Sequence, residues 1–236
     1  MNRPQPAANG IIIMISGIDT GIGKTVVTGL LARWLKDAGR RVITMKMVQT
    51  GCANLSEDIV EHRTLAGLPL QEEDAVGLTC PYVFPVPCSP HLAARLDGRR
   101  IEPRAIVEHT RQLAEHYEYV LAEGAGGLFV PLNEEALLID LPAEQQWPVV
   151  LVTSPRLGSI NHTLAALEAI EHRNIRLQGL IYNLADAPNT DPRIVDDSRR
   201  LFARRLRDMG YAERLCDVPT VSCTPSYCVD FSPLFD

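Results

Sequence analysis

Residues 17–25 (GIDTGIGKT) constrain the fold more than any other segment of this chain. They follow the apolar run of residues 11–16, which is typical of a buried parallel strand. From Thr25 onward apolar residues recur at helical spacing, and Gly39 stands where a helix would end. Because glycines between a strand and a helix let backbone N–H groups converge on an anion, the segment predicts a phosphate-binding loop.

The side chains of this loop match the chemistry of a nucleoside triphosphate. Lys24 is expected to contact the β- and γ-phosphates, and the Thr25 hydroxyl is expected to bind Mg²⁺. The start of the helix adds its partial positive charge. The loop holds one residue more than the usual spacing, and it leaves ATP or GTP open. The backbone expected to bind the phosphates belongs to Gly21, Ile22 and Gly23.

The rest of the chain alternates between strand and helix patterns. Strands are predicted at residues 41–45, 119–122, 149–153 and 177–182, and helices at residues 104–116, 159–172 and 192–209. This alternation predicts a single α/β domain over residues 11–236, with three α/β/α layers, a mostly parallel sheet and the character of a phosphate-loop NTPase. Residues 1–10 are expected to form a flexible tail. Residues 79–90 carry four prolines and are expected to be a surface loop without regular structure.

Composition argues against several classes of partner. The net charge is −6, without a block of like charges, so neither DNA nor RNA is an expected partner. The apolar run at residues 11–15 is too short for a signal peptide or a membrane span. The six cysteines form no CxxC pair, which favours reduced thiols in the cytoplasm. Three of them lie in the last 21 residues and leave a disulfide there as an alternative.

Three polar residues stand at or near predicted strand ends, where ligands bind in open α/β sheets. Lys46 follows the second strand and could neutralise charge on a γ-phosphoryl group, or simply be solvated. Glu123 ends a strand before GAGG and could hold Mg²⁺, or cap the backbone. Asp58 could also be a magnesium ligand, or begin the helix predicted at residues 58–65.

Two further segments carry histidines. His91 follows a proline at a predicted helix start, where a structural role is favoured over that of a catalytic base. Asn161 and His162 lie in the first turn of the helix at residues 159–172. Free backbone N–H groups in such a turn can bind a carboxylate.

Taken in order, these segments resemble the dethiobiotin synthase family, ATP-dependent carboxylases that close a ureido ring in biotin synthesis. The resemblance covers residues 11–185. It rests on GIDTGIGKT (17–25), KMVQTG (46–51), PYVFPVPCSPHLAA (81–94), EGAGGLFVPL (123–132), LGSINHTL (157–164) and the strand-ending Asn183.

The resemblance implies a role for each matching position. Lys24 and Lys46 would flank the γ-phosphate, Thr20 and Thr50 would lie near the reacting groups, and Asn183 would read adenine. The other implied roles are magnesium binding by Thr25, Asp58 and Glu123, and binding of the substrate carboxylate by Gly158, Ser159 and Asn161 of a second subunit in a homodimer.

The family's reaction joins 7,8-diaminononanoate and CO2 with consumption of ATP. One amine forms a carbamate, transfer of the γ-phosphoryl group gives a carbamic–phosphoric anhydride, and the second amine closes the ring. Two features depart from the family pattern: Met47 replaces the proline that usually follows the lysine, and Gly21 replaces an acidic residue found in some members. After Asn183 the resemblance fades.

Three other functions are considered. A partitioning or septum-positioning ATPase would carry an additional lysine in the phosphate loop and a basic or membrane-binding surface, and this chain shows neither. An amide ligase acting on cobalamin precursors would need a glutaminase domain, for which too few residues follow Asn183. A catalytically inactive relative of the synthase stays open.

Overall fold

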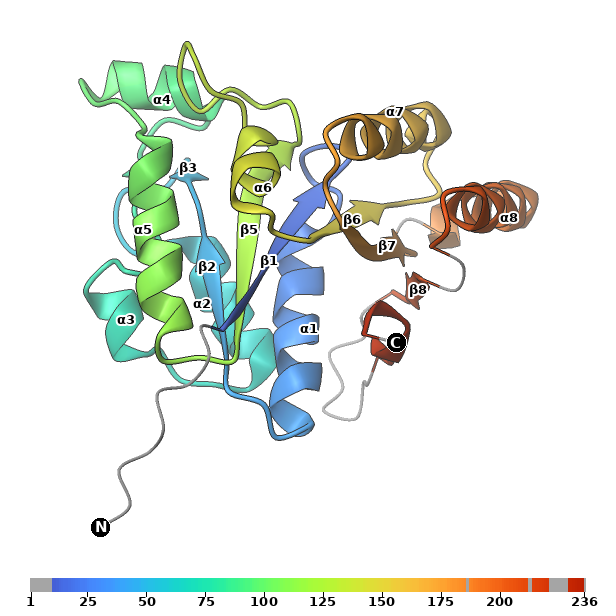
Figure 1. The fold of residues 1–236 in the computed structure, drawn as a ribbon, viewed down its shortest axis with the longest axis horizontal. Helices are drawn as coiled ribbons and strands as arrows, with labels where there is room; N and C mark the ends of the chain where they lie inside the picture. The colour runs from blue at the N-terminus through green and yellow to red at the C-terminus, as the bar shows by residue number, and fades with distance from the viewer. Residues whose placement is uncertain (1–9, 186, 212–213, 221–228, 236) are drawn as a thin grey trace.

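A parallel sheet forms the centre of the molecule (Figure 1). The computed structural model describes residues 10–185, 187–211, 214–220 and 229–235, and within these ranges the sheet has six strands in the order β2-β5-β1-β6-β7-β8. All of their pairings are parallel. The strands are β1 (Ile11–Gly17), β2 (Val42–Lys46), β5 (Tyr119–Gly127), β6 (Val149–Thr153), β7 (Leu177–Asn183) and β8 (Leu215–Val218).

Helices cover both faces of this sheet, so the predicted three-layer architecture is confirmed. Alternate residues of β1 show why its sequence is continuously apolar: Ile13 and Ile15 pack on one face, and Met14 packs on the other. The first face carries α1 (Lys24–Asp37) and α2 (Glu57–Ala66). The second carries α5 (Pro103–Ala114), α6 (Asp140–Gln145), α7 (Ser159–His172) and α8 (Pro192–Asp208).

A small second sheet corrects the expectation for residues 79–90. There β4 (Val83–Phe84) pairs with β3 (Gln49–Thr50), and the Phe84 side chain is fully buried. The pairing tolerates the prolines because the donors come from the other segment: Gln49 N–H bonds the Tyr82 carbonyl (2.8 Å) and Cys52 N–H bonds the Phe84 carbonyl (3.1 Å). Two short helices, α3 (Glu72–Ala75) and α4 (Pro90–Leu96), precede and follow β4 in the chain, and α4 contacts β3.

The C-terminal segment completes the first face. A turn of 3-10 helix, η2 (Ser232–Leu234), packs against β7 and β8, two strands at the far edge of the sheet. Phe235 stacks on Trp34 of α1 with ring centroids 5.3 Å apart, and the edge of Phe231 also meets Trp34. A second short turn, η1 (Ala187–Asn189), follows β7. Among the described residues, no helix is both long and apolar enough to cross a membrane.

Most predicted bounds agree with the structure to within two residues, and those of β6 and α7 agree fully. The predicted end of β5 at residue 122 is wrong: the strand continues to Gly127, which still pairs with Gly17 of β1, so Glu123 lies inside the strand.

Gly39 ends α1 as predicted: it follows the C-cap residue Ala38 with a φ of 77°, and its N–H donates to the Lys36 carbonyl at 2.9 Å. Arg40 N–H donates to the Leu35 carbonyl at 3.0 Å, which completes a Schellman cap. The predicted flexible tail lies almost entirely outside the described residues. So do Cys223 and Cys228, on which the disulfide alternative depends.

Candidate active site

The phosphate loop turns sharply between β1 and α1. Gly21 and Gly23 adopt φ values of 68° and 92°, which side-chain-bearing residues rarely adopt. Gly17 is also required, because a Cβ atom there would lie 2.5 Å from the Ile22 side chain. Lys24 begins α1, and its Nζ donates to the Asp19 carbonyl at 2.8 Å. The ammonium group therefore folds back over the loop that the sequence predicts to bind phosphate.

Lys24 is held in a setting that disfavours its own charge. The residue is only 6% exposed. Burial, and after it the positive charge of Lys46, lowers the pKa of Lys24 to about 8. Two buried ammonium groups close together attract an anion strongly, so the pair matches a polyphosphate.

Lys46 lies between two carboxylates at the end of β2. Its Nζ donates to Glu123 Oε1 at 2.6 Å and also forms an ion pair with Asp58. Burial alone would lower the pKa of Lys46, but the two carboxylates outweigh burial and raise it. Thr25 Oγ1 donates to the same Glu123 oxygen at 3.2 Å. The predicted residues Thr25, Lys46, Asp58 and Glu123 thus meet in one cluster beside the phosphate loop.

The register of the sheet brings Lys46 and Glu123 together. The two residues are direct neighbours in the pairing of β2 with β5. Beyond the last strand residue, Met47 N–H donates to the Glu123 carbonyl at 2.9 Å. Proline has no N–H group and could not make this bond. Met47, which departs from the family's usual proline, therefore extends the contact between β5 and the end of β2.

Glu123 has one partner that the sequence reasoning missed. His62, on α2, is fully buried, and its Nε2 lies 2.7 Å from Glu123 Oε2. Burial raises the pKa of Glu123, but Lys46 and His62 outweigh burial and bring the pKa down to about 2. Asp58 and His62 are four residues apart on one helix, and that spacing is the signal that could have indicated their common face.

The start of α2 fixes the position of Asp58. Ser56 is the N-cap residue, and its hydroxyl oxygen accepts from Ile59 N–H at 3.3 Å. The Ser56 hydroxyl donates in turn to Gln49 Oε1 at 2.7 Å. Asp58 is thus both an acid in the first turn of a helix, the alternative raised by the sequence, and a member of the cluster.

The donors of this cluster fit Mg²⁺ if substrate phosphates complete the coordination. Asp58 and Glu123 offer carboxylate oxygens and Thr25 offers a hydroxyl, all hard donors that Mg²⁺ prefers. Within the described part of the chain, no group of three His, Cys, Asp or Glu side chains could hold a metal ion without such help. Magnesium commonly binds through one or two carboxylates together with substrate phosphates and water.

The other predicted residues lie around the cluster without touching it. Thr20 is exposed, and its Oγ1 would lie 3.4 Å from a Cβ atom on Gly126, in the GAGG segment. Thr50 ends β3 and is half-buried. At the start of α7, Gly158 has a φ of 91°, Ser159 is buried and Asn161 is exposed. Arg156 joins that helix start to the phosphate loop through an ion pair with Asp19.

Asn183 ends β7 beside the phosphate loop. Its Nδ2 donates to the Ile22 carbonyl at 2.9 Å, and its Oδ1 accepts from Ala185 N–H at 3.2 Å. A Cβ atom on Gly23 would lie 2.1 Å from Nδ2. In this structure the carboxamide therefore fastens the loop to the sheet.

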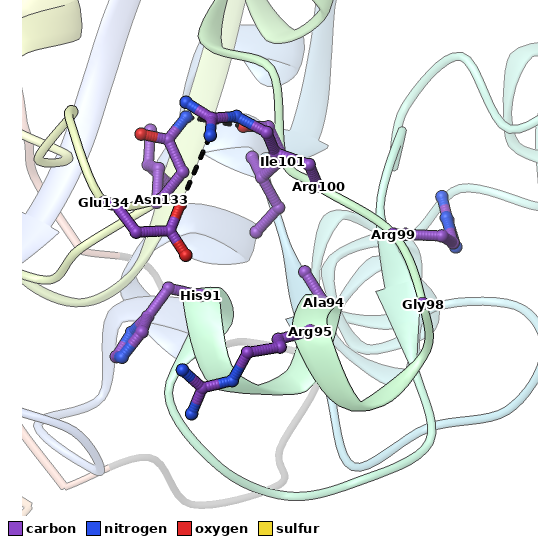
Figure 2. A pocket seen from close by; sticks show the side chains of 10 residues that line it. His91, Ala94, Arg95, Gly98, Arg99, Arg100, Ile101, Asn133 and Glu134 are labelled. Atoms are coloured by element: carbon purple, nitrogen blue, oxygen red, sulfur yellow. Dashed lines mark hydrogen bonds and ion pairs between the residues drawn. The ribbon is translucent and has the colours of Figure 1, made fainter.

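His91 lies apart from the cluster. It lines a pocket of about 280 Å³ with Arg95, Arg100 and Glu134, and Figure 2 shows that Arg100 is paired with Glu134 there. A second pocket, of about 390 Å³, is lined by residues that include Ser56, Asp74 and Cys80. Neither pocket is lined by residues of the phosphate loop.

Comparisons with known proteins agree with this geometry. A family model described as an AAA domain matches residues 12–224. A protein from Pasteurella multocida named ATP-dependent dethiobiotin synthetase BioD 2 is 50% identical over 195 residues, covering 83% of this chain and 91% of that protein. ATP-dependent dethiobiotin synthetase BioD from Chlorobaculum tepidum is 50% identical over 211 residues, covering 89% and 87%.

Solved structures show the same fold at low sequence identity. A nucleotide-binding protein from Archaeoglobus fulgidus in complex with ADP has a TM-score of 0.51 at 15% identity, covering 90% of this chain and 83% of that one. A ParA family ATPase from Chlorobium tepidum has a TM-score of 0.51 at 14% identity, covering 91% and 86%. At such identities the likeness extends to the fold alone.

Proposed function

This chain belongs to the family of ATP-dependent dethiobiotin synthetases, and we propose that its cluster of Lys24, Lys46, Asp58 and Glu123 carries the family's reaction. The reaction is the ATP-dependent carboxylation and ring closure of 7,8-diaminononanoate in biotin synthesis. The observation that carries the proposal is the convergence of two buried lysines and two carboxylates beside the phosphate loop.

The chemistry explains why such a cluster is needed. One amine nitrogen adds to the carbon of CO2 and loses a proton, which gives a carbamate. A carbamate oxygen then takes the γ-phosphoryl group of ATP, and ADP leaves. The second amine attacks the activated carbonyl carbon, so the ring closes and phosphate departs. The protein contributes positioning and charge stabilisation, as is usual for phosphoryl transfer.

Each residue of the cluster has a place in this scheme. Lys24 and Lys46 neutralise charge that develops around the γ-phosphoryl group. The electrostatic influence of Lys46 on Lys24, whose pKa it helps to lower, supports that role. Thr25, Asp58 and Glu123 hold Mg²⁺, which when bound neutralises phosphate charge. Thr20 and Thr50 orient the reacting groups. The backbone of Gly21, Ile22 and Gly23 binds the phosphates.

The substrate carboxylate is assigned to the start of α7, at Gly158, Ser159 and Asn161. The partial positive charge at the start of a helix supports the assignment, although Ser159 N–H donates to the Arg156 carbonyl at 3.1 Å in this structure. The proposal also includes a homodimer, in which this helix start serves the partner's site, and a cytoplasmic location. The free thiols of four described cysteines, Cys52, Cys80, Cys88 and Cys216, support a reducing compartment.

Asn183 is proposed to serve adenine recognition as well as the loop. Its contact with Ile22 places its carboxamide at the edge of the phosphate loop, which supports a nearby base. Comparing ATP with GTP and CTP as substrates tests this role. In Asn183→Ala, the ratio of kcat/KM for ATP to that for GTP or CTP should be smaller than in wild type. Unchanged preference in a folded variant would remove Asn183 from base recognition.

The decisive experiment measures ADP release from ATP, Mg²⁺ and bicarbonate with and without 7,8-diaminononanoate. We expect release that depends on the diamine. ATP hydrolysis of equal rate without the diamine would contradict the proposal and favour a switch ATPase. Folded protein that releases no ADP under either condition would instead indicate an inactive relative.

A further inference from the structure

The carboxylate of Glu123 is held through both of its oxygens by different partners. Oε1 accepts from Lys46 Nζ at 2.6 Å and from Thr25 Oγ1 at 3.2 Å. Oε2 lies 2.7 Å from His62 Nε2, and both side chains are fully buried. Two oxygens with fixed and separate partners leave the carboxylate no freedom to rotate.

His62 is itself held by a buried chain of polar groups. Its Nδ1 lies 3.1 Å from Thr44 Oγ1, and Arg63 Nη1 donates to the same oxygen at 2.7 Å. Arg63 is anchored by Asp74, to which its Nε and Nη2 donate at 2.9 and 2.7 Å. The chain Asp74–Arg63–Thr44–His62 thus runs through the interior and ends at Glu123.

The chemistry of the donors fixes the hydrogens along this chain. A guanidinium group only donates, so the Thr44 oxygen accepts from Arg63. The Thr44 hydroxyl hydrogen is then free to point to His62 Nδ1, which accepts it. An ionised carboxylate only accepts, so His62 Nε2, which faces Glu123 Oε2, carries the proton and donates it.

We propose that His62, fixed by Thr44 and Arg63, is a positioning residue that directs Glu123 Oε1 toward Thr25 and the phosphate loop. The inference rests on the proposed role of Glu123 in binding Mg²⁺ with the nucleotide. His62 occupies Oε2, so Oε1 is the oxygen that Glu123 offers. Partners that orient metal ligands in this way commonly contribute about 10- to 100-fold to metal affinity.

Three variants test this role. His62→Leu removes the donor, Thr44→Val removes the link to Arg63, and His62→Gln restores an N–H donor at the end of the side chain. The readout is Mn²⁺ binding in the presence of ADP, followed by electron paramagnetic resonance, because Mn²⁺ takes the oxygen ligands that suit Mg²⁺. Diamine KM is measured beside it.

We expect His62→Leu to weaken Mn²⁺ binding by about tenfold or more, with diamine KM within about twofold of wild type. Thr44→Val should show a smaller loss, and His62→Gln should recover most of the affinity. The matched controls are His109→Leu and Thr110→Val, since His109 and Thr110 bond backbone carbonyls outside the cluster. Both controls should bind Mn²⁺ like wild type.

Failure of the inference can be told from failure of the proposed function through Glu123→Gln. Lost Mn²⁺ affinity in Glu123→Gln together with wild-type affinity in His62→Leu would overturn the positioning role alone. Wild-type affinity in Glu123→Gln would overturn the magnesium role of Glu123 and the inference with it. If His62→Leu does not fold, the other two variants still test the inference. Wild-type Mn²⁺ affinity in Thr44→Val, or a loss of about tenfold or more in folded His62→Gln, overturns it.

Discussion

Lys24 shows how a residue proposed to bind phosphate can work against the stability of its own fold. Its pKa is lowered from 10.5 to about 8, mainly by burial and then by Lys46. The charged form is therefore disfavoured in the folded protein by up to about 3 kcal/mol, at 1.36 kcal/mol per pKa unit. Lys24→Met should remove this penalty, stabilising the nucleotide-free protein at pH 7 while abolishing its binding of ATP.

The sign of the pH dependence follows from linkage. Between pH 8 and 10.5 the unfolded chain keeps the Lys24 proton that the folded protein has lost, so wild-type stability rises with pH there. The difference in unfolding free energy by which Lys24→Met exceeds wild type should therefore decrease between pH 8 and 10.5. Urea unfolding at several pH values measures it, with Lys36→Met, outside the site, as control. An advantage that does not change with pH would contradict the burial argument.

Lys46 should matter more for rate than for fold. Lys46→Ala removes one of the two charges proposed to stabilise phosphoryl transfer, and we expect kcat to fall by about 100-fold or more. Lys36→Ala is the matched control, because Lys36 bonds the Ala66 carbonyl at the far end of α2. Diamine-dependent ADP release measures both variants. Near wild-type turnover of folded Lys46→Ala would remove Lys46 from the reaction.

At the scale of elements, the junction between the phosphate loop and β7 depends on the absence of a side chain at one glycine. Gly21 and Gly23 both have positive φ values, but a Cβ atom on Gly21 meets nothing within 4 Å, whereas one on Gly23 would lie 2.1 Å from Asn183 Nδ2. Gly21→Ala should cost about 1 kcal/mol of unfolding free energy from backbone strain alone. Gly23→Ala should cost about 1–3 kcal/mol more through overpacking.

Asn183 supplies the test of that explanation. In the double variant Gly23→Ala/Asn183→Ala the overlap disappears, so the two effects on unfolding free energy should be strongly non-additive. Urea denaturation of the four proteins in the cycle gives the coupling energy. Purely additive effects would mean that a side chain at residue 23 and the Asn183 side chain do not overlap sterically.

Long apolar patterns allowed the sequence to predict the elements that carry them. Very short strands, and the direction in which a helical side chain points, could not be predicted in this way. β1 and β6 are continuous apolar runs, and the ends of parallel strands share one edge, which brought Lys46 and Glu123 together in prediction. β4 has two residues, too few for a period. The place of His62 depends on how α2 is rotated about its axis, which packing decides.

At the scale of the whole molecule, the C-terminal segment packs into the core, although the sequence predicted no regular structure for it. Phe231 is fully buried and belongs to the same cluster as Leu31 of α1 and Ile181 of β7, so the C-terminal segment joins elements that are distant in the chain. This contact closes the face of the sheet that carries α1. It also ties the helix that begins at the phosphate loop to the far edge of the sheet.

Phe231→Ala should therefore destabilise the entire fold, by about 3–5 kcal/mol, because it leaves a cavity between α1 and β7. Phe129→Ala is the control, since Phe129 is 54% exposed and its removal leaves no such cavity. Urea unfolding followed by far-UV circular dichroism measures the loss, and Trp34 fluorescence should change because the edge of Phe231 contacts the Trp34 ring. A loss no larger than that of Phe129→Ala would show that the C-terminal segment is an appendage to a core that is stable without it.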